Sequence, residues 1–250
     1  MYMQVKPVQS LNVQIFADGA DRNGILELYK NPLIKGFTTN PTLMRKAGIQ
    51  DYSAFAKQIL SDIPDRPFSF EVFSDEFDEM EKQARIIATW GENVFVKIPV
   101  TNTRKEPAYA LIQQLADAGI KLNITAVMPL EQVAAIIPTL KNSPESYISV
   151  FAGRIADTGV DPVPFMAQAV EMLRPYPNIK LLWASPRELL NIFQADEIGC
   201  DIITVTHDVL KKLSLVGKNL EDYSLETVEM FYNDAKAVNY TISESAFVSV

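Results

Sequence analysis

Eight short runs rich in β-branched and aromatic residues recur along the whole chain, and a longer stretch separates each run from the next. Between them, stretches such as 77–90 and 106–119 carry apolar residues three and four positions apart, which is typical of amphipathic helices. Gly119 marks the expected end of the second helix. We expect strands at residues 13–18, 33–38, 68–73, 93–100, 121–127, 146–152, 179–185 and 200–206.

Strict alternation of strands and helices predicts an α/β fold, and eight such units predict a closed parallel (β/α)8 TIM barrel. The main alternative is a doubly wound open sheet, which usually has fewer strands and often a glycine-rich first turn. A chain of 250 residues fits one barrel, so we expect a single domain over residues 1–250. An additional helix is expected at about residues 224–238, where it would cover a barrel face or reach a neighbouring subunit.

The composition is that of an ordinary globular protein, with 48% hydrophobic and 22% charged residues. A net charge of −8 argues against nonspecific binding to nucleic acid or to an anionic membrane, because both need an excess of Lys and Arg. The single cysteine excludes an intramolecular disulfide, and the sequence lacks a signal-like start and any 18-residue apolar run. We therefore expect a cytoplasmic protein that does not span a membrane.

Few residues in this chain can bind a soft metal ion. His207 and Cys200 are the only histidine and cysteine, so a His-rich or Cys-rich metal site is excluded within one chain, although carboxylate-bound magnesium stays open. The sequence also lacks a GxxxxGK[ST] phosphate loop and a GxGxxG dinucleotide motif. We expect chemistry that uses side chains alone, with no cofactor and no metal.

One expected strand carries a lysine among apolar residues. In NVFVKIPV (93–100), Val96 and Ile98 share the parity that faces the helices, which directs Lys97 toward the barrel axis. Burying an unpaired ammonium costs several kcal/mol or more, so this side chain either reaches water or works as an amine. A purely structural ion pair with Glu71 is the other interpretation.

The same alternation directs further polar side chains toward the axis, mostly near the carboxyl ends of the strands, where barrel enzymes build their sites. Each residue alone has a structural interpretation: Asp18 or Asn40 as a helix cap, Thr125 as a buried hydroxyl, Arg154 or Arg187 as a surface charge. Together they predict a site. Besides Lys97, the inward set comprises Asp18, Thr38, Asn40, Ser69, Glu71, Asn123, Thr125, Ser149 and Phe151.

A lysine inside a barrel has a well-defined chemical use. Desolvation lowers the pKa of a lysine, and the neutral amine that results attacks carbonyl groups. The iminium ion so formed accepts the electrons of a breaking C–C bond and requires no metal. Such a site also needs a carboxylate that moves protons and polar groups that hold hydroxyls. Asp18 and Glu71 supply the carboxylates, while Asn40, Asn123 and Thr125 supply polar groups.

Seven segments in order and spacing resemble the transaldolases, including their small subfamily and the related fructose-6-phosphate aldolases. The likeness covers about residues 13–237, and TTNP followed by VKIP is its most specific part. The segments are IFADGA, GFTTNPTLM, FSFEV, VFVKIPVT, NITAV, SVFAGRIADTG and LLWASPRE.

The resemblance implies a role for each site residue. Lys97 matches the Schiff-base lysine, and Asp18 matches the acid/base for the substrate's C4 hydroxyl. Glu71 and Thr125 match the pair that holds the catalytic water and assists carbinolamine formation and loss. The residues implied to hold the dihydroxyacetone unit are Thr38, Asn40, Asn123 and Ser149, and those implied to bind phosphate are Arg154, Ser185 and Arg187.

Two positions distinguish the activities within the family. Fructose-6-phosphate aldolases carry glutamine and tyrosine where this chain has Glu71 and Phe151, and transaldolases carry glutamate and phenylalanine, as here. One departure is Pro186, which stands where the family usually has phenylalanine. In addition, Trp183 has the same parity as Ser185, which predicts that its ring also reaches the axis and narrows the pocket.

The resemblance thus implies transfer of a dihydroxyacetone unit from a ketose phosphate, such as fructose 6-phosphate or sedoheptulose 7-phosphate. The acceptor would be an aldose phosphate, such as erythrose 4-phosphate or glyceraldehyde 3-phosphate, within the non-oxidative pentose phosphate pathway. The alternatives are an aldolase that releases free dihydroxyacetone and a catalytically silent barrel that binds sugar phosphates. Small members of the family often form homo-oligomers through the C-terminal helix, so residues 224–238 are the expected contact.

Overall fold

The computed structural model describes residues 5–242, and it contains all eight expected strands. Each strand begins and ends within two residues of its predicted range. The strands are β1 (Gln14–Asp18), β2 (Ile34–Thr38), β3 (Phe68–Glu71), β4 (Val94–Pro99), β5 (Leu122–Val127), β6 (Ser146–Val150), β7 (Ile179–Trp183) and β8 (Ile202–Thr206).

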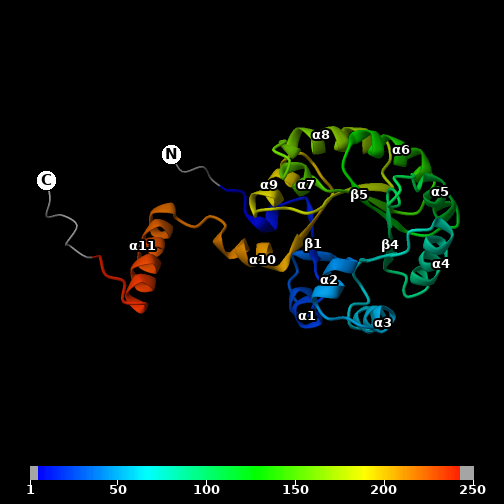
Figure 1. The fold of residues 1–250 in the computed structure, drawn as a ribbon. Coiled ribbons are helices and arrows are strands. Elements are labelled where there is room, and N and C mark those ends of the chain that lie inside the picture. Colours follow the sequence, from blue (N-terminus) through cyan, green and yellow to red (C-terminus); the bar gives the residue numbers. More distant parts are fainter. Residues whose placement is uncertain (1–4, 243–250) are drawn as a thin grey trace. The chain divides into compact units, whose positions relative to one another are not determined.

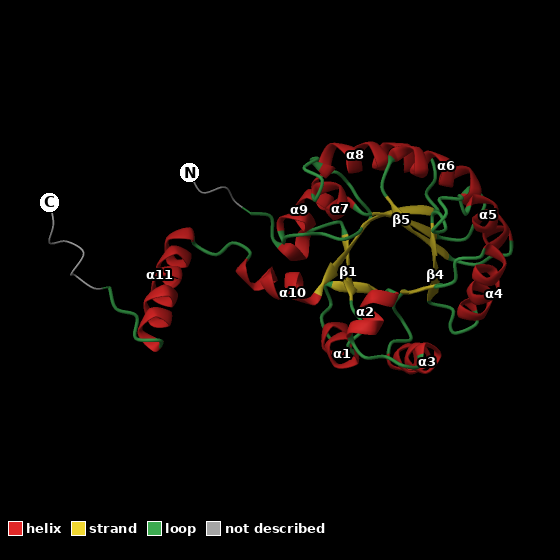
Figure 2. Ribbon diagram, in the orientation of Figure 1, coloured by secondary structure: helices red, strands yellow, loops and turns green. Residues whose placement is uncertain are grey.

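The strands pair in sequence order, every pair is parallel, and β8 also pairs with β1, so the sheet closes. Helices follow the strands and form an outer ring around them (Figures 1 and 2). The predicted TIM barrel is confirmed, and the doubly wound alternative is wrong. The helices of the ring are α1 (Arg22–Tyr29), α2 (Pro41–Lys46), α3 (Tyr52–Asp62), α4 (Phe77–Ala88), α5 (Tyr109–Asp117), α6 (Leu130–Leu140), α7 (Ala152–Ala156), α8 (Pro162–Leu173), α9 (Leu190–Glu197) and α10 (His207–Leu210). Two short 3-10 segments, η1 (Val8–Ser10) and η2 (Lys211–Leu215), precede β1 and follow α10 in the sequence.

The helix α5 begins three residues later than the pattern predicts. Pro107 instead forms an antiparallel bridge with Thr101, and the amide of Ala108 donates to the carbonyl of Val100, so this segment is tied to the end of β4. The expected end is observed: Gly119 follows the helix at φ 78°, a left-handed conformation that glycine adopts without a steric penalty.

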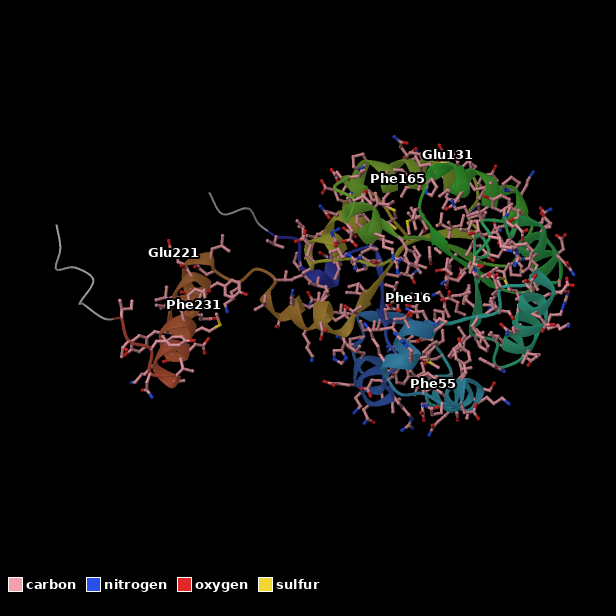
Figure 3. All side chains as sticks on the ribbon, in the orientation of Figure 1. Phe16, Phe55, Glu131, Phe165, Glu221 and Phe231 are labelled. Atoms are coloured by element: carbon pink, nitrogen blue, oxygen red, sulfur yellow. The ribbon has the colours of Figure 1, made fainter. Side chains whose placement is uncertain are left out.

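An apolar cluster fills the lower part of the barrel axis. Phe95 and Tyr147 stack with ring centroids 4.0 Å apart, and Phe16 meets Tyr147 edge-on at 6.0 Å. Phe16, which is labelled in Figure 3, lies on β1 inside the barrel. On their strands, these residues stand two positions before Lys97, Ser149 and Asp18, so the next inward layer is polar. The remaining members of the cluster are Leu182, Ala184 and Ile202. The apolar floor therefore separates the polar layer from the amino-terminal end of the barrel.

The chain divides into two compact units, one of residues 8–213 and the other of residues 1–7 and 214–250. The second contains the expected C-terminal helix, α11 (Leu220–Ala237), which begins four residues before its predicted start. Asn219 explains the earlier start, because its side chain accepts hydrogen bonds from the amides of Glu221 and Asp222 and so caps the helix. Within residues 5–242, neither α11 nor any other helix is long and apolar enough to cross a membrane. One domain over residues 1–250 stays a prediction.

Gly36 on β2 provides a test of the axial packing. A Cβ atom at this position would lie 2.6 Å from Cζ of the fully buried Phe16 ring. Because overpacking a filled core displaces side chains, we expect Gly36→Ala to lower the free energy of unfolding by about 1–3 kcal/mol. Gly19→Ala is the control, since a Cβ atom there meets nothing within 4 Å. Urea denaturation measures the stability of both variants. Equal stabilities of Gly36→Ala and Gly19→Ala would contradict tight packing of Phe16 against Gly36.

Candidate active site

Lys97 projects from β4 into the axis, with 7% of its side chain exposed. Its Nζ atom donates to the carbonyl oxygen of Thr39 at 2.9 Å and lies 3.1 Å from Oε2 of Glu71. Strand register explains the second contact, because Glu71 on β3 stands directly opposite Lys97. The amine is thus held inside the barrel between one oxygen from the residue after β2 and one from the last residue of β3.

Asp18 ends β1 on the other side of the same space. Its Oδ1 atom accepts a hydrogen bond from the hydroxyl of Thr38 at 2.7 Å, and that hydroxyl lies 2.5 Å from the hydroxyl of Thr204. Burial raises the pKa of the Asp18 carboxyl, although Lys97 and the Thr38 hydrogen bond act in the opposite direction. Asp18 therefore retains a proton to a higher pH than an ordinary aspartate, which suits a group that takes up and returns protons.

Asp18 does not cap the next helix, so that structural interpretation is wrong. The N-cap of α1 is Asp21, whose carboxylate accepts from the amide of Gly24 at 2.7 Å. Asn40 does act as a cap, since its Oδ1 atom accepts from the amide of Leu43 at the start of α2. Asn40 also lines the cavity that contains Lys97, so the cap and the site are compatible roles.

A chain of buried hydrogen bonds fixes the polar layer between β3 and β6. Asn123 donates from Nδ2 to the hydroxyl of Ser69 at 3.0 Å, and its Oδ1 atom accepts from the hydroxyl of Ser149 at 2.6 Å. Asn123 stands opposite Lys97 in the β4–β5 register. The amide thus has a fixed orientation beside the lysine.

Thr125 lies where the pairing of β5 and β6 becomes irregular, between Ile124 and Val127. Ala126 at the same point has φ 60°, which is unfavourable for a residue with a Cβ atom. The hydroxyl of Thr125 is buried in the cavity wall and has no hydrogen-bond partner among the described residues. A buried hydroxyl in this state has its donor and acceptor capacity available to a ligand.

Two arginines also line the cavity, Arg154 on α7 and Arg187 after β7. Arg187 donates from Nε to the carbonyl of Gly153 at 3.3 Å and to Oδ1 of Asp157 at 3.0 Å, and its Nη2 atom contacts the second oxygen of that carboxylate. Arg154 places its guanidinium 5.4 Å from the centre of the Phe151 ring. Gly153 permits this arrangement, because a Cβ atom there would lie 1.5 Å from the carbonyl oxygen of Ser185.

The structure brings the predicted site residues together around one cavity of about 160 Å³. Glu71 does not line this cavity, but its carboxylate contacts the Nζ atom of Lys97, which does. Thr204 and Thr206 also line it, and inward parity on β8, where Ile202 belongs to the axial cluster, was the signal that would have identified them. The lining comprises Asp18, Thr38, Asn40, Lys97, Asn123, Thr125, Ser149, Phe151, Arg154, Ala184, Ser185, Pro186, Arg187, Thr204 and Thr206.

The prediction that Trp183 reaches the axis is wrong. Leu182 and Ala184 belong to the axial cluster, so Trp183 lies on the opposite parity, and it is fully buried away from the cavity. Ser185 nevertheless lines the cavity, because its φ of 60° breaks the two-residue alternation after the strand has ended. Pro186 therefore lines the pocket, whereas the indole of Trp183 does not.

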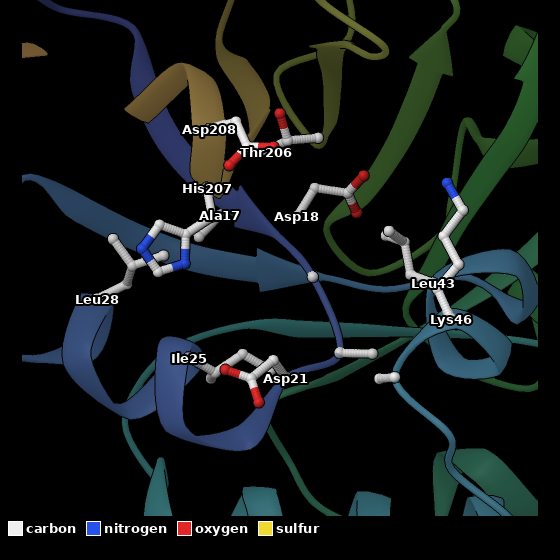
Figure 4. A pocket seen from close by; sticks show the side chains of 13 residues that line it. Ala17, Asp18, Asp21, Ile25, Leu28, Leu43, Lys46, Thr206, His207 and Asp208 are labelled. Atoms are coloured by element: carbon white, nitrogen blue, oxygen red, sulfur yellow. The ribbon is translucent and has the colours of Figure 1, made fainter. Parts of the chain in front are cut away.

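A second pocket of about 420 Å³ adjoins this cavity, and both include Asp18 and Thr206 (Figure 4). Ile25 and Leu28 of α1 form part of its wall, while Lys46 of α2 lies across from them. Among the described residues, no group of three or more His, Cys, Asp or Glu side chains is arranged to hold a metal ion.

The family model for transaldolase/fructose-6-phosphate aldolase matches residues 15–246. The chain belongs to this family. A probable transaldolase of Dehalococcoides mccartyi is 34% identical over 202 residues, which cover 80% of this chain and 90% of that protein. A probable transaldolase of Caldicellulosiruptor saccharolyticus is 33% identical over 204 residues, covering 81% of this chain and 89% of that protein. The family resemblance predicted from the sequence is thus confirmed.

The fold is shared more widely than the family. Dihydrodipicolinate synthase from Rhodopseudomonas palustris matches with a TM-score of 0.55, covering 95% of this chain and 83% of its own. At 13% identity, this likeness shows a common barrel and nothing about activity.

Burial of the Asp18 carboxyl predicts a pH-dependent effect on stability. A raised pKa in the folded state means that Asp18 favours folding below its unfolded pKa and that this contribution is lost as the pH rises through the folded value. We therefore expect Asp18→Asn to raise the melting temperature at neutral pH, because the variant does not bury a carboxylate. Thermal denaturation across a pH series measures the difference, which should shrink as the pH falls. An Asp18→Asn variant less stable than the wild type at neutral pH would contradict the raised pKa of Asp18.

Proposed function

We propose that this chain is a metal-independent transaldolase that transfers a dihydroxyacetone unit between sugar phosphates through a Schiff base on Lys97. The observation that carries the proposal is the position of Lys97, buried at the carboxyl end of the barrel with Nζ 3.1 Å from Glu71 and in the same cavity as Asp18. An amine with one carboxylate in its cavity and a second carboxylate in contact with its nitrogen provides the groups that iminium chemistry requires.

In the proposed reaction, the Lys97 nitrogen adds to the C2 carbonyl of a ketose phosphate and the carbinolamine loses water to give an iminium ion. Glu71, beside the nitrogen, and the unpartnered hydroxyl of Thr125 are suited to hold the water that leaves and returns. Asp18 then takes the proton of the C4 hydroxyl while the C3–C4 bond breaks. The bonding electrons pass to the iminium, which leaves an enamine on Lys97 and releases the aldehyde.

Transfer reverses these steps with another aldehyde. The enamine carbon attacks the acceptor carbonyl, Asp18 returns its proton to the new alkoxide, and water releases the product from Lys97. Thr38, Asn40, Asn123 and Ser149 are proposed to hold the hydroxyls of the bound three-carbon unit, since all four line the cavity.

The phosphate is proposed to bind at the arginine end of the cavity. Arg154, Ser185 and Arg187 line that end together, and a guanidinium fork matches the oxygens of a phosphate group. Fructose 6-phosphate or sedoheptulose 7-phosphate as donor, and erythrose 4-phosphate or glyceraldehyde 3-phosphate as acceptor, satisfy this arrangement of charge at one end and carbonyl chemistry at the other.

Phe151 favours transfer over release of free dihydroxyacetone. The enamine must persist until an acceptor arrives, and protonation of its carbon would end the cycle early. A phenylalanine in the cavity wall presents no proton donor, in contrast to a tyrosine. The relatives named probable transaldolase support the same choice.

The helix α11 supports the proposed self-association. The helix exposes many large apolar side chains, and large exposed apolar patches typically mark protein–protein contacts. We propose that a second copy of the chain covers them. These side chains include Leu220, Tyr223, Leu225, Val228, Met230, Phe231 and Tyr232.

Borohydride reduction tests the Schiff base. With fructose 6-phosphate and borohydride, we expect the wild type to gain the mass of a reduced dihydroxyacetone adduct, because reduction makes the imine permanent. Lys97→Met removes the nitrogen and should gain no mass. Mass spectrometry of the intact protein measures both, and Lys180→Met, at a lysine outside the cavity, is the control that should still form the adduct. A wild type without adduct would leave only the silent-barrel alternative.

Acceptor dependence distinguishes transferase from aldolase. With fructose 6-phosphate alone, we expect little free dihydroxyacetone, whereas addition of erythrose 4-phosphate should raise donor consumption by about 100-fold or more, equivalent to about 2.7 kcal/mol in barrier height. Coupled assays for glyceraldehyde 3-phosphate and dihydroxyacetone, run with and without acceptor, give the two rates. Comparable release of free dihydroxyacetone with and without acceptor would identify an aldolase.

A further inference from the structure

Tyr52, the first residue of α3, forms two hydrogen bonds with the backbone of a single residue in the site. Its hydroxyl donates to the carbonyl oxygen of Glu71 at 2.9 Å and accepts from the amide of Glu71, also at 2.9 Å. Tyr52 does not line the cavity, and it belongs to none of the motifs found in the sequence. Its contact with Glu71 nevertheless connects it to the oxygen beside the lysine.

The sheet has an opening at this point, which explains the unusual contact. The strands β2 and β3 pair only through Phe37 with Phe68 and Thr38 with Ser69. Beyond this level the chain leaves β2 for α2, which begins at Pro41. The backbone of Glu71 faces the opening, because the alternate residue Val72 donates its amide to Lys97 on the other side of β3.

The Tyr52 hydroxyl therefore makes the two hydrogen bonds that β2, which has already ended, does not make to the backbone of Glu71. Buried backbone groups need hydrogen-bond partners, and one hydroxyl supplies both a donor and an acceptor. The ring is held by aromatic neighbours, with centroids 6.2 Å from Phe70, 5.6 Å from Phe73 and 5.8 Å from Trp90. Burial raises the pKa of the Tyr52 hydroxyl, so it keeps its proton and remains a donor.

The two oxygens that hold Lys97 come from the two sides of this opening. Thr39 follows β2 and supplies its carbonyl oxygen, while Glu71 ends β3 and supplies its carboxylate. Their separation fixes where the Nζ atom lies. A change in the position of the Glu71 backbone would therefore move one of the two contacts of the amine and leave the other in place.

We infer that Tyr52 is a positioning residue that sets the place of the Glu71 carboxylate at the amine of Lys97. The inference rests on the proposed function, in which Glu71 holds water at the carbinolamine. It makes α3, a helix outside the barrel, part of the geometry of the reacting nitrogen. It also predicts that Tyr52 acts only through Glu71, which a mutant cycle detects.

Tyr52→Phe tests this inference while keeping the aromatic ring. We expect kcat for transfer to fall about tenfold and KM for fructose 6-phosphate to stay within about twofold, since the hydroxyl lies outside the cavity and affects only the water steps. In a Glu71→Gln background, the same substitution should change kcat by less than about twofold, because the group that it positions has already been altered. Steady-state kinetics of the four proteins complete the cycle.

Tyr147→Phe is the matched control, since it also removes a hydroxyl from a buried tyrosine. That hydroxyl donates to Glu145, and Tyr147 belongs to the axial cluster below the site. We expect its kcat to stay within about twofold of the wild-type value, a change too small to indicate a role at the reacting groups. A merely structural role for Tyr52 would give the same fold-loss in both Glu71 backgrounds, and that additive result would overturn the inference, as would an unchanged kcat in Tyr52→Phe.

Two further measurements separate the possible failures. Hydrogen exchange on the wild type needs no variant: the Glu71 amide should be protected, and exchange at the rate of a free amide would overturn the inference even if Tyr52→Phe does not fold. The borohydride adduct tests the proposed function on its own. An adduct with an additive cycle rejects the role of Tyr52 alone, whereas a wild type without adduct rejects both.

Discussion

A nitrogen donor buried inside a protein needs an oxygen partner, and the arrangement of this site follows from that requirement at Lys97. The buried Nζ atom lies between a backbone carbonyl from the end of β2 and a carboxylate from the end of β3. The two contacts fix the position of the nitrogen that, in the proposed reaction, adds to the carbonyl group of the substrate.

The closed barrel makes this possible by dividing its axis into two layers. Phe16, Phe95 and Tyr147 fill the lower layer, and the residues two positions further along the same strands are polar. Because the floor is filled by large rings, the polar layer opens only toward the carboxyl ends of the strands. Asn123 then acquires a fixed orientation from its neighbours Ser69 and Ser149. The residues that stabilise the barrel axis and the polar residues of the site therefore lie two positions apart on the same strands.

Much of this could be predicted from the sequence, because strands in a barrel impose a strict alternation. The eight strands and the inward direction of Lys97 followed from that rule. The rule failed for Trp183, since Ser185 lies after the strand at a positive φ and carries no parity information about it. It was also silent about Asp157 and Tyr52, which lie on or beside helices and reach the site through contacts between distant parts of the chain. Such contacts depend on where helices pack, and no local pattern encodes that.

The ion pair between Arg187 and Asp157 has a consequence for how the site treats sugars that lack a phosphate. The Arg187 guanidinium is already paired with the Asp157 carboxylate, so Arg187 itself is not left as an isolated charge when the proposed site holds an uncharged sugar. A phosphate, in turn, has to share Arg187 with the aspartate, and its gain on binding is correspondingly smaller. In the proposed phosphate site, Asp157 would therefore reduce the difference in affinity between phosphorylated and unphosphorylated sugars, although it contacts neither Lys97 nor Asp18.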